Sequence, residues 1–252
     1  MIEFICNDCK TPLVKVDCEL RCMQCKETKF KSMNDLYLAD ESETFKVDRT
    51  ILQHFMENKY IASIYTNYWR PFGFLNLKGF LSEEKELELL IDSTRKSNAR
   101  VLDVCCGPGY FTERIADKMP ENEVIGVDFS VPMLKEAQKK KNKVSAYLQA
   151  SAYELPFLSE SVDTIICNGA LHILESLEDL FIEFGRVLKS GGKFTGFFLK
   201  KYRSRLVSNL AGMSSLHYWD EDFVLGLFRS AGFEIEDLSR HHRAIYFSVS
   251  KS

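Results

Sequence analysis

The order of hydrophobic and polar residues changes period repeatedly over the second half of the chain. Short runs that are almost entirely apolar alternate with longer segments in which apolar residues recur at helical spacing. The apolar runs predict buried parallel strands, and the other segments predict amphipathic helices. The predicted strands are 101–105, 124–128, 144–149, 162–167, 193–199, 233–238 and 244–249, and the predicted helices are 111–119, 131–140, 177–188 and 220–231. This alternation indicates an α/β fold, with helices on both faces of a mostly parallel sheet.

Residues 39–98 are predicted to form a polar linker followed by a helical region. Apolar residues recur at helical spacing from Phe45 to Tyr65, and residues 83–94 predict an amphipathic helix with Ser82 as its N-cap. An aromatic cluster lies between these two segments: Tyr60, Tyr65, Tyr68, Trp69, Phe72 and Phe74. Two interpretations stay open for the cluster, because aromatic side chains line many small-molecule pockets and also pack helices onto a core.

Residues 1–38 carry four cysteines in two C-x2-C pairs that are separated by twelve residues: Cys6, Cys9, Cys22 and Cys25. Each pair fits a tight turn, and two such turns supply four thiolates to a tetrahedral zinc ion. The segments 13–16 and 18–21 predict two short strands between the pairs. Because so short a segment cannot build its own core, a zinc ion with a structural role would supply the missing stability. The alternative is four unrelated thiols, and Cys18 is interpreted as a non-ligand.

Composition limits the classes of protein to which the chain can belong. At 252 residues, with 45% hydrophobic and 27% charged residues, it suits one large globular domain with a small appendage. The predicted division is 1–38, 39–98 and 99–252. No apolar run is long enough for a membrane span, and the N-terminus does not resemble a signal peptide, so we expect a cytoplasmic protein. The eight cysteines then indicate metal ligands or buried thiols, and the net charge of −3 disfavours strong non-specific binding to nucleic acid.

The stretch from Arg100 to Phe111 combines a predicted strand, a glycine turn and the start of a helix. Gly107-Pro108-Gly109 follows the strand directly, a layout that presents backbone N–H groups and a helix N-terminus to a ligand. Asp103, just before the turn, would repel a pyrophosphate but attract the sulfonium and ammonium groups of S-adenosylmethionine (SAM). The sequence therefore favours SAM over a dinucleotide.

A second carboxylate lies at the end of the next predicted strand. Asp128 follows Gly109 by 19 residues, a separation that places an acid near the ribose of a bound nucleoside. The alternative, an Asp128 that caps the next helix, is weaker because Ser130 stands directly before Val131-Pro132. Asp103, the two glycines and Asp128 together indicate a site for the cofactor.

With these motifs, residues 84–250 resemble the class I SAM-dependent methyltransferases, in the broad group that includes quinone-biosynthesis C-methyltransferases. The matching motifs are 101–109, 126–130 with Met133-Leu134, 154–157, Val162-Asp163 leading to Ala170–His172, 186–192 and 231–233. The resemblance implies a seven-stranded, Rossmann-like, mostly parallel sheet with a reversed last strand pair. It also implies that the chain binds SAM and transfers its methyl group. The N-terminal segment resembles the zinc ribbons that precede certain rRNA guanine methyltransferases.

The resemblance assigns the cofactor site to a set of residues along the motifs: Asp103, Cys105, Gly107, Gly109, Asp128, Phe129, Met133, Ser151, Ala152 and Asn168. Asp103 and the glycine turn would hold the methionine end, Asp128 the ribose, and Phe129 would lie beside the adenine. Asn168 would lie near the methionine moiety or the reacting centre. Ser151 departs from the Asp that the family often has, and Cys105 stands where glycine is common.

Methyl transfer from SAM needs an acceptor atom held in line with the S–CH3 bond, and an alcohol or phenol also needs a base. His172 and Tyr65 are the candidates for a catalytic role, although His172 is often structural in this family. The expected acceptor is a small, partly apolar or aromatic molecule. One alternative is an RNA base methyltransferase, supported by the ribbon and by the basic cluster 200–205. Another is a non-catalytic SAM-binding module, and the accepting atom and oligomeric state stay open.

Overall fold

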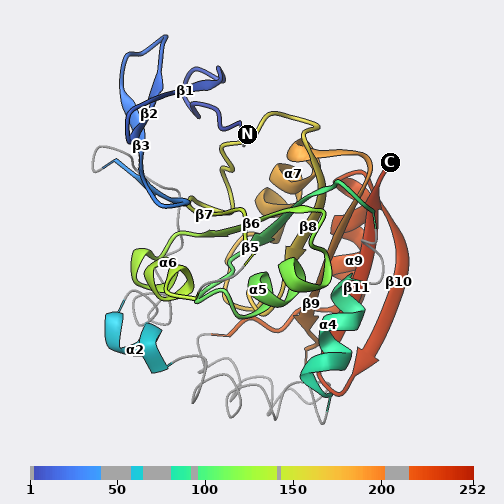
Figure 1. The fold of residues 1–252 in the computed structure, drawn as a ribbon. Coiled ribbons are helices and arrows are strands. Elements are labelled where there is room, and N and C mark those ends of the chain that lie inside the picture. Colours follow the sequence, from blue (N-terminus) through green and yellow to red (C-terminus); the bar gives the residue numbers. More distant parts are fainter. Residues whose placement is uncertain (1–2, 41–57, 65–80, 92–95, 141–142, 202–215) are drawn as a thin grey trace.

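A mixed sheet of eleven strands forms the frame of the chain in a computed structural model, which describes residues 3–40, 58–64, 81–91, 96–140, 143–201 and 216–252. In spatial order the strands are β1 (Leu13–Val16), β2 (Glu19–Cys22), β3 (Thr28–Met33), β4 (Leu36–Ala39), β7 (Ala146–Gln149), β6 (Glu123–Asp128), β5 (Arg100–Val104), β8 (Val162–Cys167), β9 (Leu188–Leu199), β11 (Ala244–Lys251) and β10 (Phe233–His241). Figure 1 shows that the four N-terminal strands continue the sheet beyond β7.

The strands β5 to β9 are parallel, and β11 and β10 complete the sheet as antiparallel neighbours of β9. The chain runs from β5 outward to β7 and then returns to β8 on the other side of β5. The region beyond the carboxyl ends of β5 and β8 is therefore a topological switch point, the place where open α/β sheets bind their ligands. These ends point toward the bottom of Figure 1.

The predicted seven strands are all present, but the prediction of a seven-stranded sheet is wrong, because β4 pairs in parallel with β7 and joins the N-terminal strands to it. The register places Leu36 opposite Tyr147 and Tyr37 opposite Leu148. Without β4, β7 would be an edge strand with unpaired backbone groups, a position that proteins usually cover. The apolar pattern within each segment predicted the strands, but it contains no information about which edges meet.

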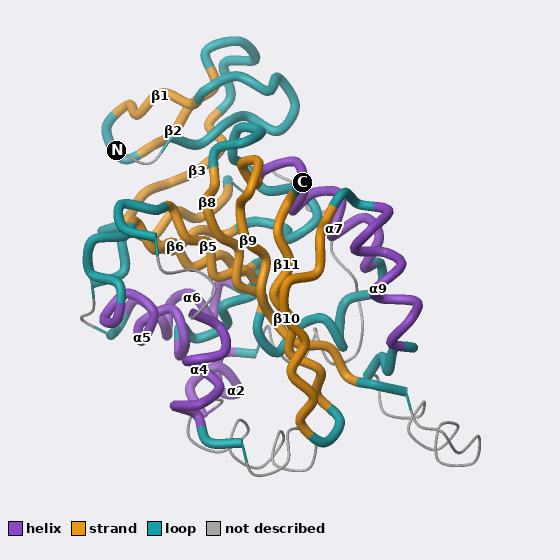
Figure 2. Tube along the Cα trace, turned by 90° about the vertical axis from the view of Figure 1, so that its right-hand side faces the viewer, coloured by secondary structure: helices purple, strands orange, loops and turns teal. Residues whose placement is uncertain are grey.

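Helices cover both faces of the sheet, as predicted. Figure 2 shows α4 (Glu83–Ile91), α5 (Tyr110–Lys118) and α6 (Val131–Gln138) on one side, and α7 (Leu177–Val187) and α9 (Glu221–Ser230) on the other. Side chains alternate across each strand, so Val101 packs with Leu90 and Ile115 on the first side. Its neighbour Leu102 belongs to the cluster on the second side, which is rich in phenylalanine: Phe181, Phe184, Phe194, Phe228 and Phe247.

The N-terminal strands share their core with the rest of the chain. Phe4, Leu20 and Phe30 belong to the main hydrophobic cluster, and the Phe4 ring lies 5.5 Å from the Phe157 ring, centroid to centroid. The backbone N–H of Ile5 also donates to the carbonyl of Pro156, at 3.0 Å. Residues 3–40, which we call the ribbon, therefore pack directly on the segment that follows β7.

The helical region before β5 is described only in part. The helix α4 begins after Ser82, whose hydroxyl accepts from the Lys85 N–H, and this confirms the predicted N-cap. The helix α2 (Lys59–Ile64) carries Tyr60, which is exposed. Most of the predicted helix 45–65 and the remaining aromatic residues of the cluster lie outside the described residues: Tyr65, Tyr68, Trp69, Phe72 and Phe74.

One boundary differs clearly from the prediction. The strand β9 begins at Leu188, directly after α7, rather than at Lys193. Leu188 is the C-cap of α7 and already has extended dihedrals, so the chain passes from helix to strand without a separate loop. Gly191 and Gly192 lie inside this strand. None of the helices in the described residues is long and apolar enough to cross a membrane.

Candidate functional site

The turn after β5 owes its shape to three residues with left-handed backbone dihedrals. Cys105, Gly107 and Gly109 have φ values of 59°, 55° and 72°, and Gly109 is the N-cap position of α5. A side chain at such a φ costs about 1 kcal/mol, a cost that Cys105 bears and the two glycines avoid. The prediction of a tight glycine turn between strand and helix is confirmed.

The two glycines of the turn have different surroundings. A Cβ on Gly109 would lie 2.8 Å from the hydroxyl oxygen of Tyr147 and 2.9 Å from the Cβ of Ala137, so close packing forbids a side chain. A Cβ on Gly107 would meet no atom of the described chain within 4 Å. Gly109 is thus required for packing against α6 and β7, whereas Gly107 faces open space where a ligand can approach the backbone.

Asp128, at the end of β6, holds this turn in place. Its Oδ2 accepts the backbone N–H of Gly107 at 2.8 Å, and its Oδ1 accepts the N–H of Ser130 at 2.8 Å. Ser130 itself caps α6, with Met133 N as the donor to its hydroxyl, so the alternative of Asp128 as the helix cap is wrong. Each carboxylate oxygen keeps a lone pair for a further donor.

Asp103 lies beneath the turn and is also buried. The Thr112 hydroxyl donates to its Oδ2 at 2.6 Å. Burial is the main cause that raises the pKa of Asp103 to about 7, against the Thr112 hydrogen bond and with the charge of Asp128 as a smaller cause in the same direction. Burial likewise raises the pKa of Asp128 to about 6. No salt bridge reaches either carboxylate within the described part of the chain.

The two cysteines of the turn pack to different sides of it. Cys105 packs with the main core, where the neighbouring Cys167 thiol and burial raise its pKa well above the usual range. Cys106 packs with Leu134 and Tyr147, and burial raises its pKa too. Both thiols are therefore protonated near neutral pH and are poor nucleophiles.

The residues assigned to the adenine side follow β6 and β7. Phe129 follows Asp128 directly, and Met133 is buried in the first turn of α6. Ser151 and Ala152 are buried just beyond β7, where the Ser151 hydroxyl accepts the N–H of Tyr153 at 3.2 Å. Because β6 and β7 are parallel neighbours, these residues lie at the same edge of the sheet as Asp128.

A buried cluster of polar side chains lies beyond the carboxyl end of β8. The Asn168 side chain donates to Oε1 of Glu86 at 3.0 Å, and the Tyr246 hydroxyl donates to the same oxygen at 2.9 Å. Glu86 is 2% exposed and lies on α4. Sequence reasoning missed Glu86, although its position four residues before Leu90 was a signal that its side chain faces the core.

His172, a catalytic candidate that also lies beyond β8, is buried and stacks its ring on that of Phe197, with 5.8 Å between centroids and 24° between the ring planes. Its carbonyl accepts the N–H of His217 at 2.7 Å, which ties the segment after β8 to the segment before α9. Trp219 makes a similar link, since its indole N–H donates to the carbonyl of Leu171. Tyr65, the other catalytic candidate, lies outside the described residues.

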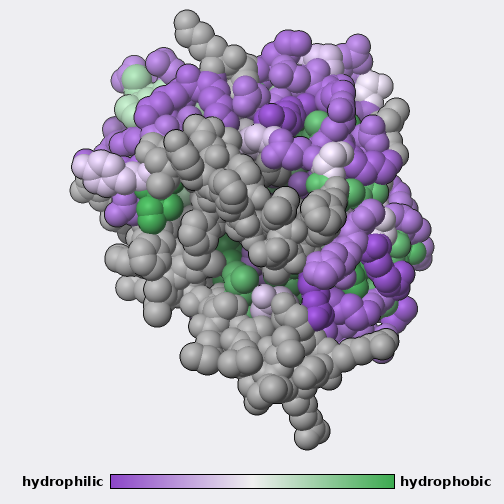
Figure 3. Space-filling view, turned by 90° about the horizontal axis from the view of Figure 1, so that it is seen from below, coloured by the Kyte–Doolittle hydropathy of each residue, from purple (hydrophilic) through white to green (hydrophobic). Residues whose placement is uncertain are grey.

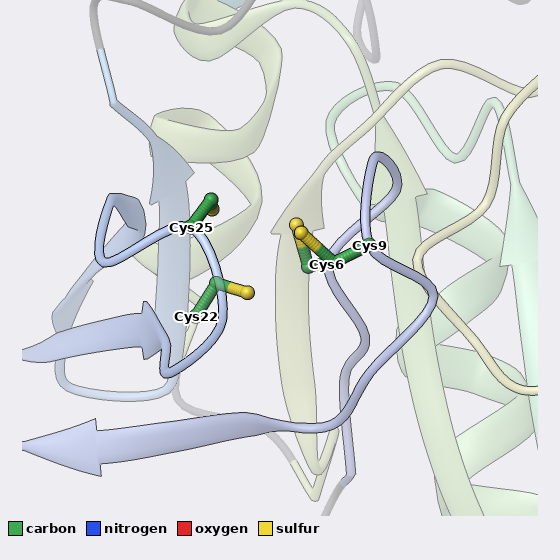
Figure 4. Close-up of side chains that lie close together, drawn as sticks. All are labelled: Cys6, Cys9, Cys22 and Cys25. Carbon is green, nitrogen blue, oxygen red and sulfur yellow. The ribbon is translucent and has the colours of Figure 1, made fainter.

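The four ribbon cysteines form a cluster, with all their Sγ atoms within 4.8 Å of one another: Cys6, Cys9, Cys22 and Cys25. Figure 4 shows the two pairs on facing turns with their thiols converging. The turns have the same design: Lys10 and Lys26 follow each pair with φ of 55° and 63°, and each N–H donates to the carbonyl of the first cysteine. Cys18 is exposed and does not belong to the cluster.

The basic cluster 200–205, singled out from the sequence, is described only at its first two residues. Lys200 forms an ion pair with Glu221, and residues 202–205 lie outside the described residues. Two lysines just after α6 are also paired, Lys139 with Glu136 and Lys140 with Glu113. Figure 3, which views the carboxyl ends of the parallel strands from below, shows the described part of this side as mostly hydrophilic, with small hydrophobic areas near its centre.

The curated proteins that resemble this chain in sequence include three that are named as methyltransferases. An uncharacterized chloroplastic methyltransferase of Arabidopsis thaliana is 27% identical over 194 residues, which is 72% of this chain and 54% of that protein. A malonyl-[acyl-carrier protein] O-methyltransferase of Hamiltonella defensa is 41% identical over 92 residues, 36% of this chain and 34% of the relative. A demethylmenaquinone methyltransferase of Lactiplantibacillus plantarum is 38% identical over 103 residues, 38% of this chain and 44% of the relative. The chain thus spans about half or less of these relatives.

Solved structures with the same fold include a methyltransferase of Bacillus halodurans, with a TM-score of 0.56 and 20% identity over 65% of this chain and 97% of the other. A complex of the Haloferax volcanii Trm112 methyltransferase activator with a methyltransferase has a TM-score of 0.62 and 14% identity. The match covers 81% of this chain and 99% of the other. Geranyl diphosphate C-methyltransferase of Streptomyces coelicolor, in complex with S-adenosyl-L-homocysteine, has a TM-score of 0.60 and 14% identity. The match covers 68% of this chain and 76% of the other.

A family model described as a methyltransferase domain matches residues 102–195. That range begins at β5 and ends inside β9, so it contains Asp103, the glycine turn, Asp128 and Asn168. Residues 102–195 therefore match a methyltransferase domain in sequence, and the fold around them is that of solved methyltransferases.

Proposed function

We propose that this chain transfers the methyl group of SAM to a small, partly apolar or aromatic acceptor. The observation that carries the proposal is the pair of buried carboxylates, Asp103 and Asp128, beside a turn whose Gly107 faces open space. Buried carboxylates are costly without a cation, and neither has an ion-pair partner among the described residues. A ligand with a sulfonium and an ammonium group would supply the missing positive charge.

The proposed cofactor contacts follow from this placement. Asp103 and the turn at Gly107 and Gly109 would hold the methionine end, with Cys105 as part of the turn. Asp128 would accept the ribose hydroxyls with the lone pairs that its two backbone hydrogen bonds leave over. The adenine would lie among Phe129, Met133, Ser151 and Ala152, and Asn168 would lie near the reacting centre.

SAM supplies an activated methyl group, so the chain's own residues need mainly to hold the acceptor in line and to exclude water. A thiol or enolate acceptor needs no base. For an alcohol or a phenol we propose His172 as the base, because it is buried beyond the carboxyl end of β8. Tyr65 remains a second candidate.

A small acceptor is supported by two observations. The relatives named above include enzymes named for demethylmenaquinone and for malonyl-[acyl-carrier protein]. The cations of the ribbon, which an RNA enzyme would use for phosphates, are mostly neutralised by carboxylates. These pairs are Lys10 with Glu154, Arg21 with Glu19, Lys29 with Asp8 and Glu27, and Lys31 with Asp40.

We further propose that Cys6, Cys9, Cys22 and Cys25 bind a structural zinc ion. Zinc–sulfur bonds of about 2.3 Å require sulfur–sulfur edges of about 3.8 Å, so the observed cluster needs only a small contraction. Backbone N–H groups of the turn, chiefly that of Cys25, and the Thr11 hydroxyl lower the pKa of Cys22 to about 6, whereas burial and the neighbouring thiols raise the pKa of Cys9. Cys22 therefore ionises before Cys9. Since the protein fills all four positions, the ion would have no open site for catalysis.

The activity is tested with methyl-labelled SAM, the purified chain and a cell extract separated into small molecules and total RNA. Label in the small-molecule fraction is the expected result. Label that appears only in RNA would favour the RNA methyltransferase. Binding of S-adenosylhomocysteine by calorimetry without transfer to either fraction would favour a non-catalytic module, and absence of binding would contradict the cofactor site itself.

A further inference from the structure

Gln149, the last residue of β7, joins three segments of the chain through its side-chain amide. Its Oε1 accepts the backbone N–H of Ala39 in β4, with 3.1 Å between the atoms. Its Nε2 donates to the backbone carbonyl of Phe129, with 3.2 Å between the atoms. One amide therefore bonds the ribbon on one side and the segment after β6 on the other.

This amide replaces a missing part of the sheet. The paired residues of β4 and β7 are only Leu36 with Tyr147 and Tyr37 with Leu148. At the next position the Ala39 N–H bonds the Gln149 side chain instead of a strand backbone. The orientation of the amide is fixed, because the Ala39 N–H can only donate and the Phe129 carbonyl can only accept.

The ribbon also supports the segment that follows Gln149. Ile5 N–H donates to the Pro156 carbonyl at 3.0 Å, and the Asn7 side chain donates to the Glu154 carbonyl at 3.4 Å. The Phe4 ring lies against the Phe157 ring. Ser151 and Ala152 lie near the start of this segment, just before these contacts. The ribbon thus supports the chain on both sides of the proposed adenine wall, at Phe129 through Gln149 and beyond β7 through residues 154–157.

We propose that Gln149 is a positioning residue through which the ribbon holds Phe129 and so sets the affinity of the site for the adenosine half of SAM. The inference rests on the proposed function. Loss of the amide would release the Phe129 carbonyl from the ribbon, and the wall would adopt several positions instead of one. A ligand then has to order the wall when it binds, which lowers its affinity.

The chain offers a matched control in Gln138, at the end of α6. Its Nε2 donates to the ribbon carbonyls of Met33 and Asn34, at 2.6 and 2.8 Å. Gln138 therefore also bonds the ribbon to the methyltransferase part, but neither of these hydrogen bonds involves Phe129. A Gln138→Leu variant removes a similar link between the same two parts without releasing the proposed wall.

The test titrates the full-length wild type, Gln149→Leu and Gln138→Leu with S-adenosylhomocysteine and with 5′-methylthioadenosine, which lacks the amino-acid part. We expect Gln149→Leu to raise the Kd of both ligands by the same factor, about tenfold, and Gln138→Leu to leave both Kd values unchanged. The equal factor places the effect on the adenosine half that both ligands share, and the comparison with Gln138→Leu separates it from a general loosening of the ribbon. Thermal unfolding of each variant shows that the binding measurements are made on folded protein.

A wild type that binds neither ligand would overturn the proposed function and the inference with it. A wild type that binds both, with unchanged affinities in Gln149→Leu, would overturn the inference alone. Equal weakening in Gln149→Leu and Gln138→Leu would also overturn it, because the effect would then follow from loosening the ribbon in general. If Gln149→Leu does not fold, Gln149→Glu takes its place, since Glu keeps the acceptor for Ala39 and loses the donor to Phe129.

Discussion

The carboxylate of Asp128 accepts the backbone N–H of Gly107, with 2.8 Å between Oδ2 and N. The bond joins the end of β6 to the turn after β5, so the residue proposed to hold the ribose also shapes the turn proposed to hold the methionine end. A substitution at Asp128 therefore acts on ligand binding and on the fold together. The choice of the substituting residue decides which effect is measured.

Asp128→Asn and Asp128→Ala are expected to separate these two roles. Asn keeps one oxygen acceptor and should fold, while S-adenosylhomocysteine binds at least about tenfold more weakly by calorimetry. Ala leaves the N–H groups of Gly107 and Ser130 without their acceptor, which should also lower the free energy of unfolding by about 1–3 kcal/mol in urea denaturation. Unchanged affinity in Asp128→Asn would contradict the ribose assignment.

Gly109→Ala and Gly107→Ala should differ in their effects on stability and on the binding of S-adenosylhomocysteine. Gly109→Ala adds a methyl group that would overlap Tyr147 and Ala137, so we expect a loss of about 2–4 kcal/mol of unfolding free energy. Gly107→Ala meets no neighbour and should cost only about 1 kcal/mol from its positive φ, yet weaken S-adenosylhomocysteine binding because the methyl group fills the ligand's space. Equal stability losses in the two variants would contradict this difference.

The affinity for SAM should fall with decreasing pH near neutrality. Burial raises the pKa of Asp103 to about 7 and that of Asp128 to about 6, so both carboxyls become neutral as the pH falls from 8 to 5. The cationic ligand binds the ionised forms, and the Kd for SAM should therefore rise about tenfold between pH 8 and pH 6. Asp103→Asn, which has no charge to lose, should bind weakly with a flatter profile. A flat profile in the wild type would show that the ligand does not use these charges.

Asp163 provides a stability prediction far from the proposed site, at the start of β8. Burial alone would raise its pKa, but hydrogen bonds from Lys189 and Lys96 outweigh burial and lower the pKa to about 2. A carboxyl whose pKa is lowered by folding stabilises the protein above its unfolded pKa near 4, and this stabilisation is lost as the pH falls toward 2.

We therefore expect Asp163→Asn to lower the unfolding free energy by about 1–2 kcal/mol at pH 7, a figure reduced for the exposure of the two lysines. The difference from the wild type should shrink between pH 4 and pH 2 in denaturation curves. Binding of S-adenosylhomocysteine should stay unchanged, since Asp163 lies at the opposite end of β8 from Asn168. A difference that is constant over this pH range would contradict the ion-pair explanation.

Metal analysis of the purified chain should find about one zinc ion per molecule. Replacement of Cys22 and Cys25 by serine should remove the metal and lower the unfolding temperature. The matched control is Cys18→Ser, which removes an exposed thiol outside the cluster and should keep both the metal and the stability. Wild-type protein that is fully stable without metal would contradict the assignment of a structural zinc ion to the four cysteines.

The sequence by itself determined the local elements of this protein. The strands and helices from residue 100 onward follow from their apolar periods, and the turn after β5 follows from Gly107, Gly109 and the preceding strand. The two C-x2-C pairs likewise indicated two tight turns. Each of these features depends on residues that are close together in the chain, where hydrophobic burial and backbone sterics act within one element.

The tertiary structure decided which distant segments meet. It joined β4 to β7, brought Glu86 against Asn168 and Tyr246, and placed the Gln149 amide between Ala39 and Phe129. Each of these contacts spans many residues, and its partners are chosen by sheet register and by the need to satisfy buried polar groups. No local pattern contains that information, because a strand edge or a buried side chain can be satisfied by any segment that the whole fold brings near it.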